Sequence, residues 1–184
     1  GTQTITWEGV SDNPTDTVDI TYAADGINFN QVIALGVLFS DLSYDEWTTP
    51  VSDTTTARVQ IMPSGFPILA DSSGEFMIDN TPPITTATVD PLSPNGENGW
   101  YITTAPQISL SCLDNLSGCL NTFYSWNGLA TTTYTVPFAA IEGQNTLFFY
   151  SEDQAVDALG AYNVETAQTQ VIKVDTVPPT IRSY

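Results

Sequence analysis

Short runs in which apolar and polar residues alternate recur along the whole chain. Val18, Ile20 and Tyr22 fall on one face of such a run, and Ile108 and Leu110 fall on one face of another. Breaks rich in Thr, Pro, Gly, Asn and Ser separate the runs, and no stretch shows the period of an amphipathic helix. The pattern therefore predicts an all-β protein built from antiparallel strands.

The runs and the breaks between them predict two successive sets of strands. The first set comprises 2–7, 17–22, 29–35, an edge segment in 38–47, 56–62 and 75–78. The second set comprises 84–89, 99–102, 107–112, 120–126, 131–138, 145–151 and 166–174. Asp25-Gly26 and Asn127-Gly128 are hairpin signals, the latter typical of a type I′ turn.

One short stretch occurs twice and organises the chain. Residues 78–83 read IDNTPP and residues 174–179 read VDTVPP, so each copy ends an apolar run with Asp and then places a Pro pair. Proline fixes φ and cannot donate to a sheet, and it pushes the preceding residue into extended geometry. We expect both copies to be stiff joints between domains, formed by Asp79, Pro82, Pro83, Asp175, Pro178 and Pro179.

The joints predict the domain organisation. We expect one β-sandwich over 1–80, a second over 81–175, and the linker and first strand of a further module over 176–184. A length of 184 residues suits two domains of this size.

The composition narrows the partners that the chain can have. The formal net charge is -18 at pH 7, because 21 acidic residues stand against Arg58, Lys173 and Arg182. Three scattered cations cannot build the basic patch that nucleic acid or an anionic membrane surface requires. No apolar run approaches the roughly 20 residues of a membrane-spanning helix. We therefore expect neither a nucleic-acid partner nor membrane insertion.

Cys112 and Cys119 are the only cysteines. With no histidine in the chain, two cysteines cannot complete a zinc site. They also lack the Cys-x-x-Cys spacing and the neighbouring cation of a redox-active pair. We predict a disulfide across the turn 114–118, which implies an oxidising, extracellular or cell-surface location.

The order of motifs in 1–80 resembles the fibronectin type III-like and related immunoglobulin-like (Ig-like) modules of secreted prokaryotic proteins. The motifs that carry this resemblance are ITW at 5–7, VDITYAADG at 18–26, WTTP at 47–50, ARVQI at 57–61, DSS at 71–73 and FMI at 76–78. Such modules usually carry one more strand before the first of these motifs. Nothing ahead of Gly1 supplies it, so we expect this domain to lack its first strand.

The second domain resembles the bacterial Ig-like repeats known as OmpL47-type domains. The matching residues are 98–101, 108–110, 114–118, 124, 142–143, 145–151, 153 and 163–165. Relative to that family, the chain has extra residues between Ala155 and Asn163. This enlarged loop either serves a contact or is simply tolerated on the surface.

Acidic residues on loops that follow strands suggest a cation site. Asp114, Glu152 and Asp153 are the candidate ligands for calcium, which takes six to eight oxygens, with Asp79 and Asp175 as further candidates. The alternative is that each Asp caps its own turn, in a chain whose acidity serves as a solvated surface. Calcium is the only cofactor that the sequence suggests.

Two further features leave alternatives open. Trp7, Trp47, Trp100 and Trp126 form either parts of the cores, which is the simpler interpretation, or a carbohydrate-stacking face. Asn115 begins an Asn-Leu-Ser triplet that fits the N-glycosylation acceptor pattern.

The residues argue against an enzyme. A chain without histidine cannot form Ser–His or Cys–His nucleophile arrangements, and no carboxylate pair is singled out for glycosidase chemistry. We predict a non-catalytic structural or spacer module of an extracellular surface or filament protein. A carbohydrate-binding or adhesive module of a secreted protein is the alternative, with a glycan as its partner.

The segment after the second joint extends this interpretation. Thr180, Ile181 and Tyr184 lie where the first strand of a next module would begin. We expect this segment to meet a further copy or module head-to-tail, either within one longer polypeptide or by strand addition between subunits.

Overall fold

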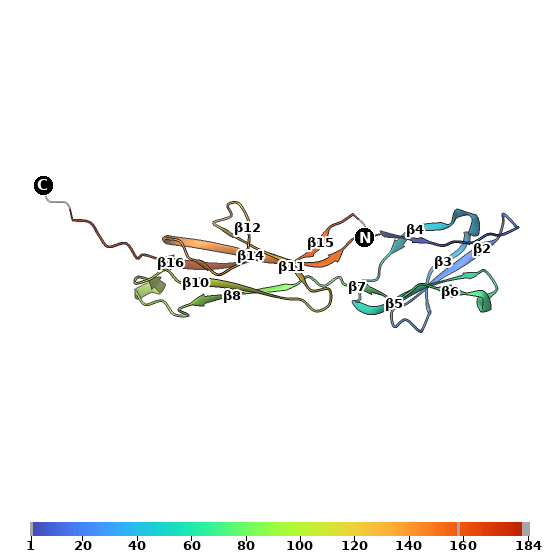
Figure 1. Ribbon diagram of the computed structural model, residues 1–184, viewed down its shortest axis with the longest axis horizontal. Helices are drawn as coiled ribbons and strands as arrows, with labels where there is room; N and C mark the ends of the chain where they lie inside the picture. Colours follow the sequence, from blue (N-terminus) through green and yellow to red (C-terminus); the bar gives the residue numbers. More distant parts are fainter. Residues whose placement is uncertain (1, 158, 182–184) are drawn as a thin grey trace. The chain divides into compact units, whose positions relative to one another are not determined.

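The computed structural model describes residues 2–157 and 159–181 and confirms the all-β class. The chain divides into two compact units, drawn in Figure 1. Unit 1 consists of Gly1–Thr81 with Ala155–Tyr162, and unit 2 consists of Pro82–Gln154 with Asn163–Tyr184.

Unit 1 is built from two antiparallel sheets. Its strands are β1 (Thr2–Thr6), β2 (Thr17–Ala23), β3 (Gln31–Leu38), β4 (Ser43–Thr48), β5 (Thr54–Pro63), β6 (Asp71–Ser72) and β7 (Phe76–Ile78), with short 3-10 helices η1 (Phe39–Asp41) and η2 (Pro67–Leu69). β1 pairs with β4, while the second sheet has the order β3-β2-β5-β6, with β7 also on β5. The turn after β2 contains Gly26 at φ 71°, where a Cβ atom would lie 2.6 Å from the Thr56 carbonyl oxygen, so only glycine fits.

The core of unit 1 lies between its two sheets. Val18, Ile20 and Tyr22 are fully buried, as the alternation of their strand predicts. Ile5 of β1 and Trp47 of β4 pack onto them from the other sheet. The unit is therefore a β-sandwich.

Unit 2 has the same two-layer construction with more strands. They are β8 (Ile84–Asp90), β9 (Trp100–Tyr101), β10 (Gln107–Leu113), β11 (Cys119–Trp126), β12 (Thr132–Thr133), β13 (Phe138–Ala139), β14 (Gly143–Val156), β15 (Tyr162–Val164) and β16 (Gln168–Val174), with the 3-10 helix η3 (Glu97–Gly99). One sheet has the order β13-β10-β8 and the other β12-β11-β14-β16-β9, with β15 on β14. β9 runs parallel to β16, whereas the pairs β8–β10, β10–β13, β11–β12, β11–β14 and β14–β16 are antiparallel.

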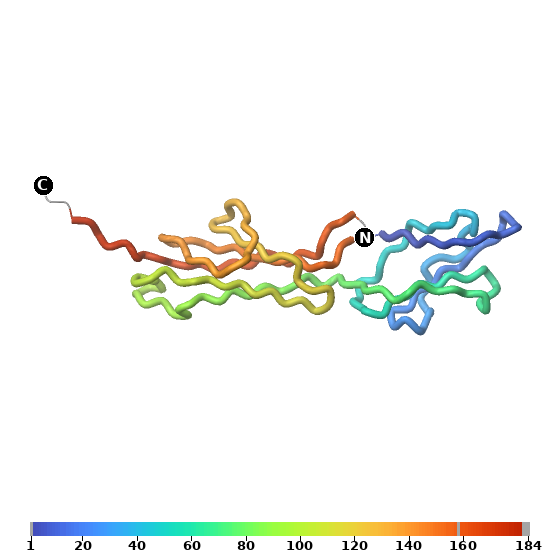
Figure 2. Tube along the Cα trace, in the orientation of Figure 1, coloured from blue at the N-terminus to red at the C-terminus, as the bar shows by residue number. Residues whose placement is uncertain are grey.

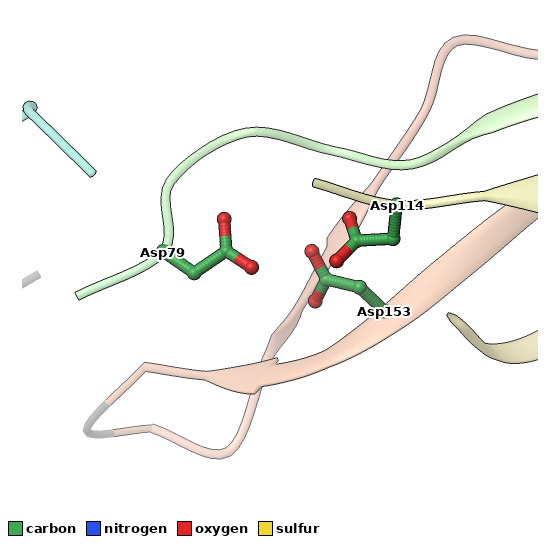
Figure 3. A group of neighbouring side chains, drawn as sticks. All are labelled: Asp79, Asp114 and Asp153. Carbon is green, nitrogen blue, oxygen red and sulfur yellow. The ribbon is translucent and has the colours of Figure 1, made fainter. Parts of the chain in front are cut away.

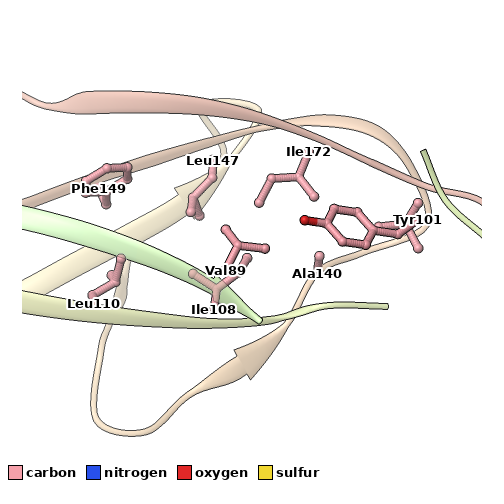
Figure 4. Close-up of a cluster of buried hydrophobic side chains, with 9 residues drawn as sticks. Val89, Tyr101, Ile108, Leu110, Ala140, Leu147, Phe149 and Ile172 are labelled. Atoms are coloured by element: carbon pink, nitrogen blue, oxygen red, sulfur yellow. The ribbon is translucent and has the colours of Figure 1, made fainter. Parts of the chain in front are cut away.

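The core of unit 2 is filled from both sheets (Figure 4). Ile108 of β10 is fully buried against Leu147 of β14, and Ile172 of β16 completes the opposite face. Tyr101, on β9, closes one end of the cluster and donates a hydrogen bond from its hydroxyl to the Pro91 carbonyl at 3.0 Å.

The strand order identifies both units as Ig-like sandwiches. Such folds set one sheet against another of the type C′-C-F-G, which unit 2 reproduces as β12-β11-β14-β16 opposite β8-β10-β13. Unit 1 repeats this arrangement, with β3-β2-β5-β6 opposite β1-β4. The tandem of antiparallel sandwiches predicted from the sequence is therefore the architecture of the chain.

Three local predictions need correction. The run 131–138 is not one strand, because β12 pairs with β11 and β13 pairs with β10 of the other sheet. Pro137, just before β13, has no N–H to continue a ladder, so the chain changes sheets there. The run 38–47 is broken by η1 and by Leu42 at φ 55°, and the run 145–151 extends to fourteen residues as β14.

Asn127 and Gly128 have φ values of 55° and 70°, as a type I′ turn requires.

Candidate functional site

The edge of β1 is the first candidate site. In unit 2 the equivalent strand, β10, has β13 on one side and β8 on the other, and β8 pairs along all seven residues of β10. Within the described residues, β1 pairs with β4 alone. Its other edge therefore presents backbone N–H and C=O groups without a strand partner, which is a template for strand addition.

A groove runs beside this open edge. It consists of two hollows of about 450 and 440 Å³, which share Ile5, Thr6, Val59 and Ser73 and so form one continuous depression. The first hollow continues past Trp7 and Phe39, and the second continues past Phe76 and Ile78. Apolar side chains of the sandwich core thus form the floor of an open channel along β1.

Both joints are held by hydrogen bonds within their own unit. In the first joint, the Asn80 N–H and the Thr81 hydroxyl donate to the Asp53 carboxylate at 2.8 and 2.5 Å. In the second, the N–H and hydroxyl of Thr176 both donate to the Glu142 carboxylate.

Asp53 and Glu142 occupy equivalent places, in the loops just before β5 and β14. Sequence reasoning did not find either residue. Each lies far from its joint in the chain, and a lone acid in a loop has no local signature.

The described residues after the second joint, 180 and 181, belong to no strand. Residues 176–181 belong to no strand and extend beyond the end of β16 (Figure 2). Ile181 is 96% exposed and Val177 is also exposed. Tyr184, which the sequence analysis included in this assembly segment, lies outside the described residues.

The acidic turn of unit 2 is the second candidate site. The Asp114 and Asp153 carboxylates turn toward one another, with oxygen atoms within 4.8 Å (Figure 3). Asp153 is 0% exposed, and one of its oxygens accepts a hydrogen bond from the Asn163 amide at 3.1 Å. The Oδ2 atom of Asp114 accepts the N–H groups of Leu116 and Gly118, which shapes the turn. The Oδ1 atom of Asp114 is buried and has no hydrogen-bond partner.

The other acids of the sequence-based proposal are Glu152, Asp79 and Asp175. Glu152 is next to Asp153 on β14, so it faces the opposite side of the sheet, where it accepts from the Asn121 amide at 2.8 Å. Asp79 lies in the first joint and accepts the Thr81 N–H, and Asp175 is exposed. Lys173, the one cation of unit 2 within the described residues, donates to the Asn98 carbonyl at 3.2 Å.

The predicted disulfide is present. Cys112 of β10 and Cys119 of β11 are bonded, with their Cα atoms 6.3 Å apart, so the bridge joins the two sheets of unit 2. Asn115, in the turn that it closes, is exposed.

The four tryptophans favour the core interpretation over a carbohydrate-stacking face. Trp47 is buried in the core of unit 1, Trp7 and Trp126 pack on the two cores, and Trp100 is half-buried. None of these four side chains is an exposed aromatic platform.

Among the described residues, two carboxyls that accept hydrogen bonds from turn backbone have pKa values below their ordinary range. Hydrogen bonds from the backbone N–H groups of Asn28 and Ile27 lower the pKa of Asp25 to about 2. Those of Ala161 and Leu159 lower the pKa of Asp157 in the loop between β14 and β15. Both shifts reflect turns that are built on the charged carboxylate.

Comparison with known proteins gives little further guidance. No family model and no curated protein matches the sequence. Among solved structures, fibronectin(III)-like modules of CbhA from Clostridium thermocellum are similar, with 11% sequence identity over 100% of this chain and 91% of that chain, and a TM-score of 0.38. The fold assignment rests on the strand order of the two units. The resemblance to OmpL47-type domains stays a prediction. The described residues also contain no helix long and apolar enough to cross a membrane.

Proposed function

We propose that the chain is a non-catalytic structural module of an extracellular surface or filament protein, which continues head-to-tail into another module through the segment after its second joint. The observation that supports this proposal is the repetition of the joint. In unit 2, the residues that follow Pro83 become β8, which covers the edge of β10. The second joint has an equivalent hydrogen-bonded geometry, so we expect the residues that follow Pro179 to form an equivalent strand on the next module.

An extracellular location agrees with the disulfide, because such bonds persist in oxidising compartments. The spacer role follows from the joints. Each joint combines a Pro pair with hydrogen bonds to a carboxylate of its own unit, which limits how freely the next segment can turn.

Sedimentation velocity of the chain over a range of concentrations tests the head-to-tail continuation. We expect oligomers that grow with concentration in the intact chain, because a heterologous contact that does not close propagates. Deleting residues 180–184 should leave monomers. Replacing Leu129, which is 73% exposed and lies in a hairpin turn of unit 2 far from the joint in sequence, with Asp is the control and should change nothing. Assembly that survives the deletion would overturn the proposal.

A second function, calcium binding, is favoured by the buried and unpartnered Oδ1 of Asp114 beside the buried Asp153. Burying carboxylates side by side is costly unless a cation or a hydrogen-bond donor compensates them. Two carboxylates supply part of the six to eight oxygens of a calcium site, and turn carbonyls and water supply the rest.

Thermal unfolding with calcium and with chelator tests this second function. Calcium at 100 times its dissociation constant would stabilise unit 2 by about 2.7 kcal/mol. The shift should disappear in Asp114→Asn, whereas Asp25→Asn, at an exposed turn, should keep it. An unfolding temperature that is equal with calcium and with chelator would rule the site out.

A further inference from the structure

The open groove of unit 1 and the segment after the second joint have complementary properties. This inference rests on the proposed head-to-tail function and names its acceptor site. We propose that residues 180–184 of a second copy of the chain add to the open edge of β1, antiparallel to it, and cover the groove lined by Ile5, Trp7, Phe76 and Ile78.

Unit 2 supplies the template for this pairing. β8 is antiparallel to β10, with Ile84 opposite Leu113 and Asp90 opposite Gln107. The residues nearest the joint therefore pair with the C-terminal end of the acceptor strand. Applied to unit 1, the same register places Thr180 and Ile181 beside the Thr6 end of β1, and the following residues toward Thr2.

The pattern of the segment suits the groove. In β8, the second residue after the joint, Thr85, is fully buried, while Ile84 and Thr86 on either side of it are exposed. The equivalent second residue after Pro179 is Ile181, an apolar side chain that lies 96% exposed. Strand addition would transfer it to the hollow beside Trp7 and Phe39.

Charge favours the same partner. Glu8 and Asp71 line the groove, and unit 1 carries a large excess of carboxylates. Arg182, between Ile181 and Ser183 in the sequence, is one of only three cations in the chain. In an added strand, Arg182 alternates to the outer face, away from the groove, and its charge is attracted by the overall negative charge of unit 1.

Binding of a peptide tests the acceptor site directly. The probe is a fluorescent peptide with the sequence of residues 175–184, and the receptor is the full chain carrying Ile181→Asp, which removes its own competing segment. We expect saturable binding by fluorescence anisotropy. A peptide with Ile181→Asp should bind roughly tenfold more weakly or worse, because burial of one isoleucine side chain is lost. No binding, or equal binding of both peptides, would overturn the proposal.

Disulfide crosslinking tests where on β1 the peptide binds and in which direction it runs, without changing a core residue. Both native cysteines are already paired, so a cysteine introduced at Thr6 or Thr2 is the receptor's single free thiol. A peptide with Thr180→Cys, which this register places opposite Thr6, should crosslink to the Thr6→Cys receptor and much less to the Thr2→Cys receptor. Crosslinking that favours Thr2, or that reaches neither position, contradicts the proposal.

The two claims fail separately. If the intact chain assembles through residues 180–184 but the peptide does not reach β1, the acceptor site is wrong and the head-to-tail function stands. If the peptide crosslinks at Thr6 and the intact chain stays monomeric, the acceptor site stands and self-assembly is wrong.

Discussion

The two units show the same sandwich in two states of completion. Unit 2 has β8 on the edge of β10 and β9 on the edge of β16, and both come from the segment that follows the first joint. Unit 1 has counterparts of β10 and of the C′-C-F-G sheet, but its described residues include none for β8 and β9. In unit 2 the strand that covers β10 is the first one after a joint, which is why the edge of β1 is the proposed acceptor for the segment after the second joint.

The largest expected difference between the units is in the stability lost when a core isoleucine is shortened to alanine. One isoleucine lies beside the covered edge of β10 and the other beside the open edge of β1. Ile108→Ala in unit 2 should cost about 2–5 kcal/mol, because Ile108 is fully buried and its strand is paired along its whole length with β8. Ile5→Ala in unit 1 should cost less, about 2 kcal/mol, because its side chain already borders an open groove. Hydrogen exchange of β14 and of β2 reports the stability of each unit separately. Equal losses in both units would remove the proposed asymmetry.

Removing the disulfide should give the next largest difference in stability between the two units. Replacing Cys112 and Cys119 with serine removes the constraint on an eight-residue loop, which is worth roughly 2–3 kcal/mol in the chain-entropy model. The loss should appear in the exchange rates of β14 and leave those of β2 unchanged. An equal loss in β2 would show that the two units do not unfold independently.

Removing the carboxylate that holds each joint should destabilise the two units by similar amounts. Asp53→Ala and Glu142→Ala each remove the acceptor of two or more hydrogen bonds, so each should destabilise its own unit by about 1 kcal/mol. Glu142→Gln keeps an acceptor and should recover part of the loss. Calorimetry of the three variants checks this. A cost at one joint only would mean that the joints are not structural equivalents.

Lowering the pH should reduce the stability of unit 1 by a small amount. Within the described residues, both carboxyls with lowered pKa values, Asp25 and Asp157, belong to unit 1. A lowered folded-state pKa gives stability that is present above the unfolded value and is lost as the pH falls through the folded one. For Asp25 this window lies between about pH 4 and about pH 2. Unfolding temperatures measured across this window should fall less steeply in Asp25→Asn than in the wild-type chain. Identical slopes would refute the effect.

Much of the fold could be predicted from the sequence because strand alternation is a local signal. The faces of β2 and β10, the turn at Asn127-Gly128 and the joint at Pro82 follow from residues within a few positions of each other. The break at Pro137 was missed because a change of sheet depends on which strand the chain meets next. The parallel pairing of β9 with β16 was missed for the same reason, since it joins segments about 70 residues apart.

The candidate site was predicted in part. Asp114 and Asp153 could be proposed because each follows or ends a predicted strand, whereas Glu152 was included although strand alternation turns it to the opposite face. The open edge was suggested by the order of motifs, but the groove beside it was not. Its floor includes Val59 and Phe76, which are distant in sequence and adjoin only after folding.

The central claim is that β1 is an acceptor strand, and its amide exchange tests this most directly. The measurement compares the amides of β1 with those of β10 in the chain carrying Ile181→Asp, alone and saturated with the peptide of residues 175–184. We predict that β1 exchanges faster than β10 in the chain alone, and that the peptide slows β1 selectively while β10 is unchanged. Exchange from β1 that is already as slow as from β10, or that does not respond to the peptide, would contradict the account.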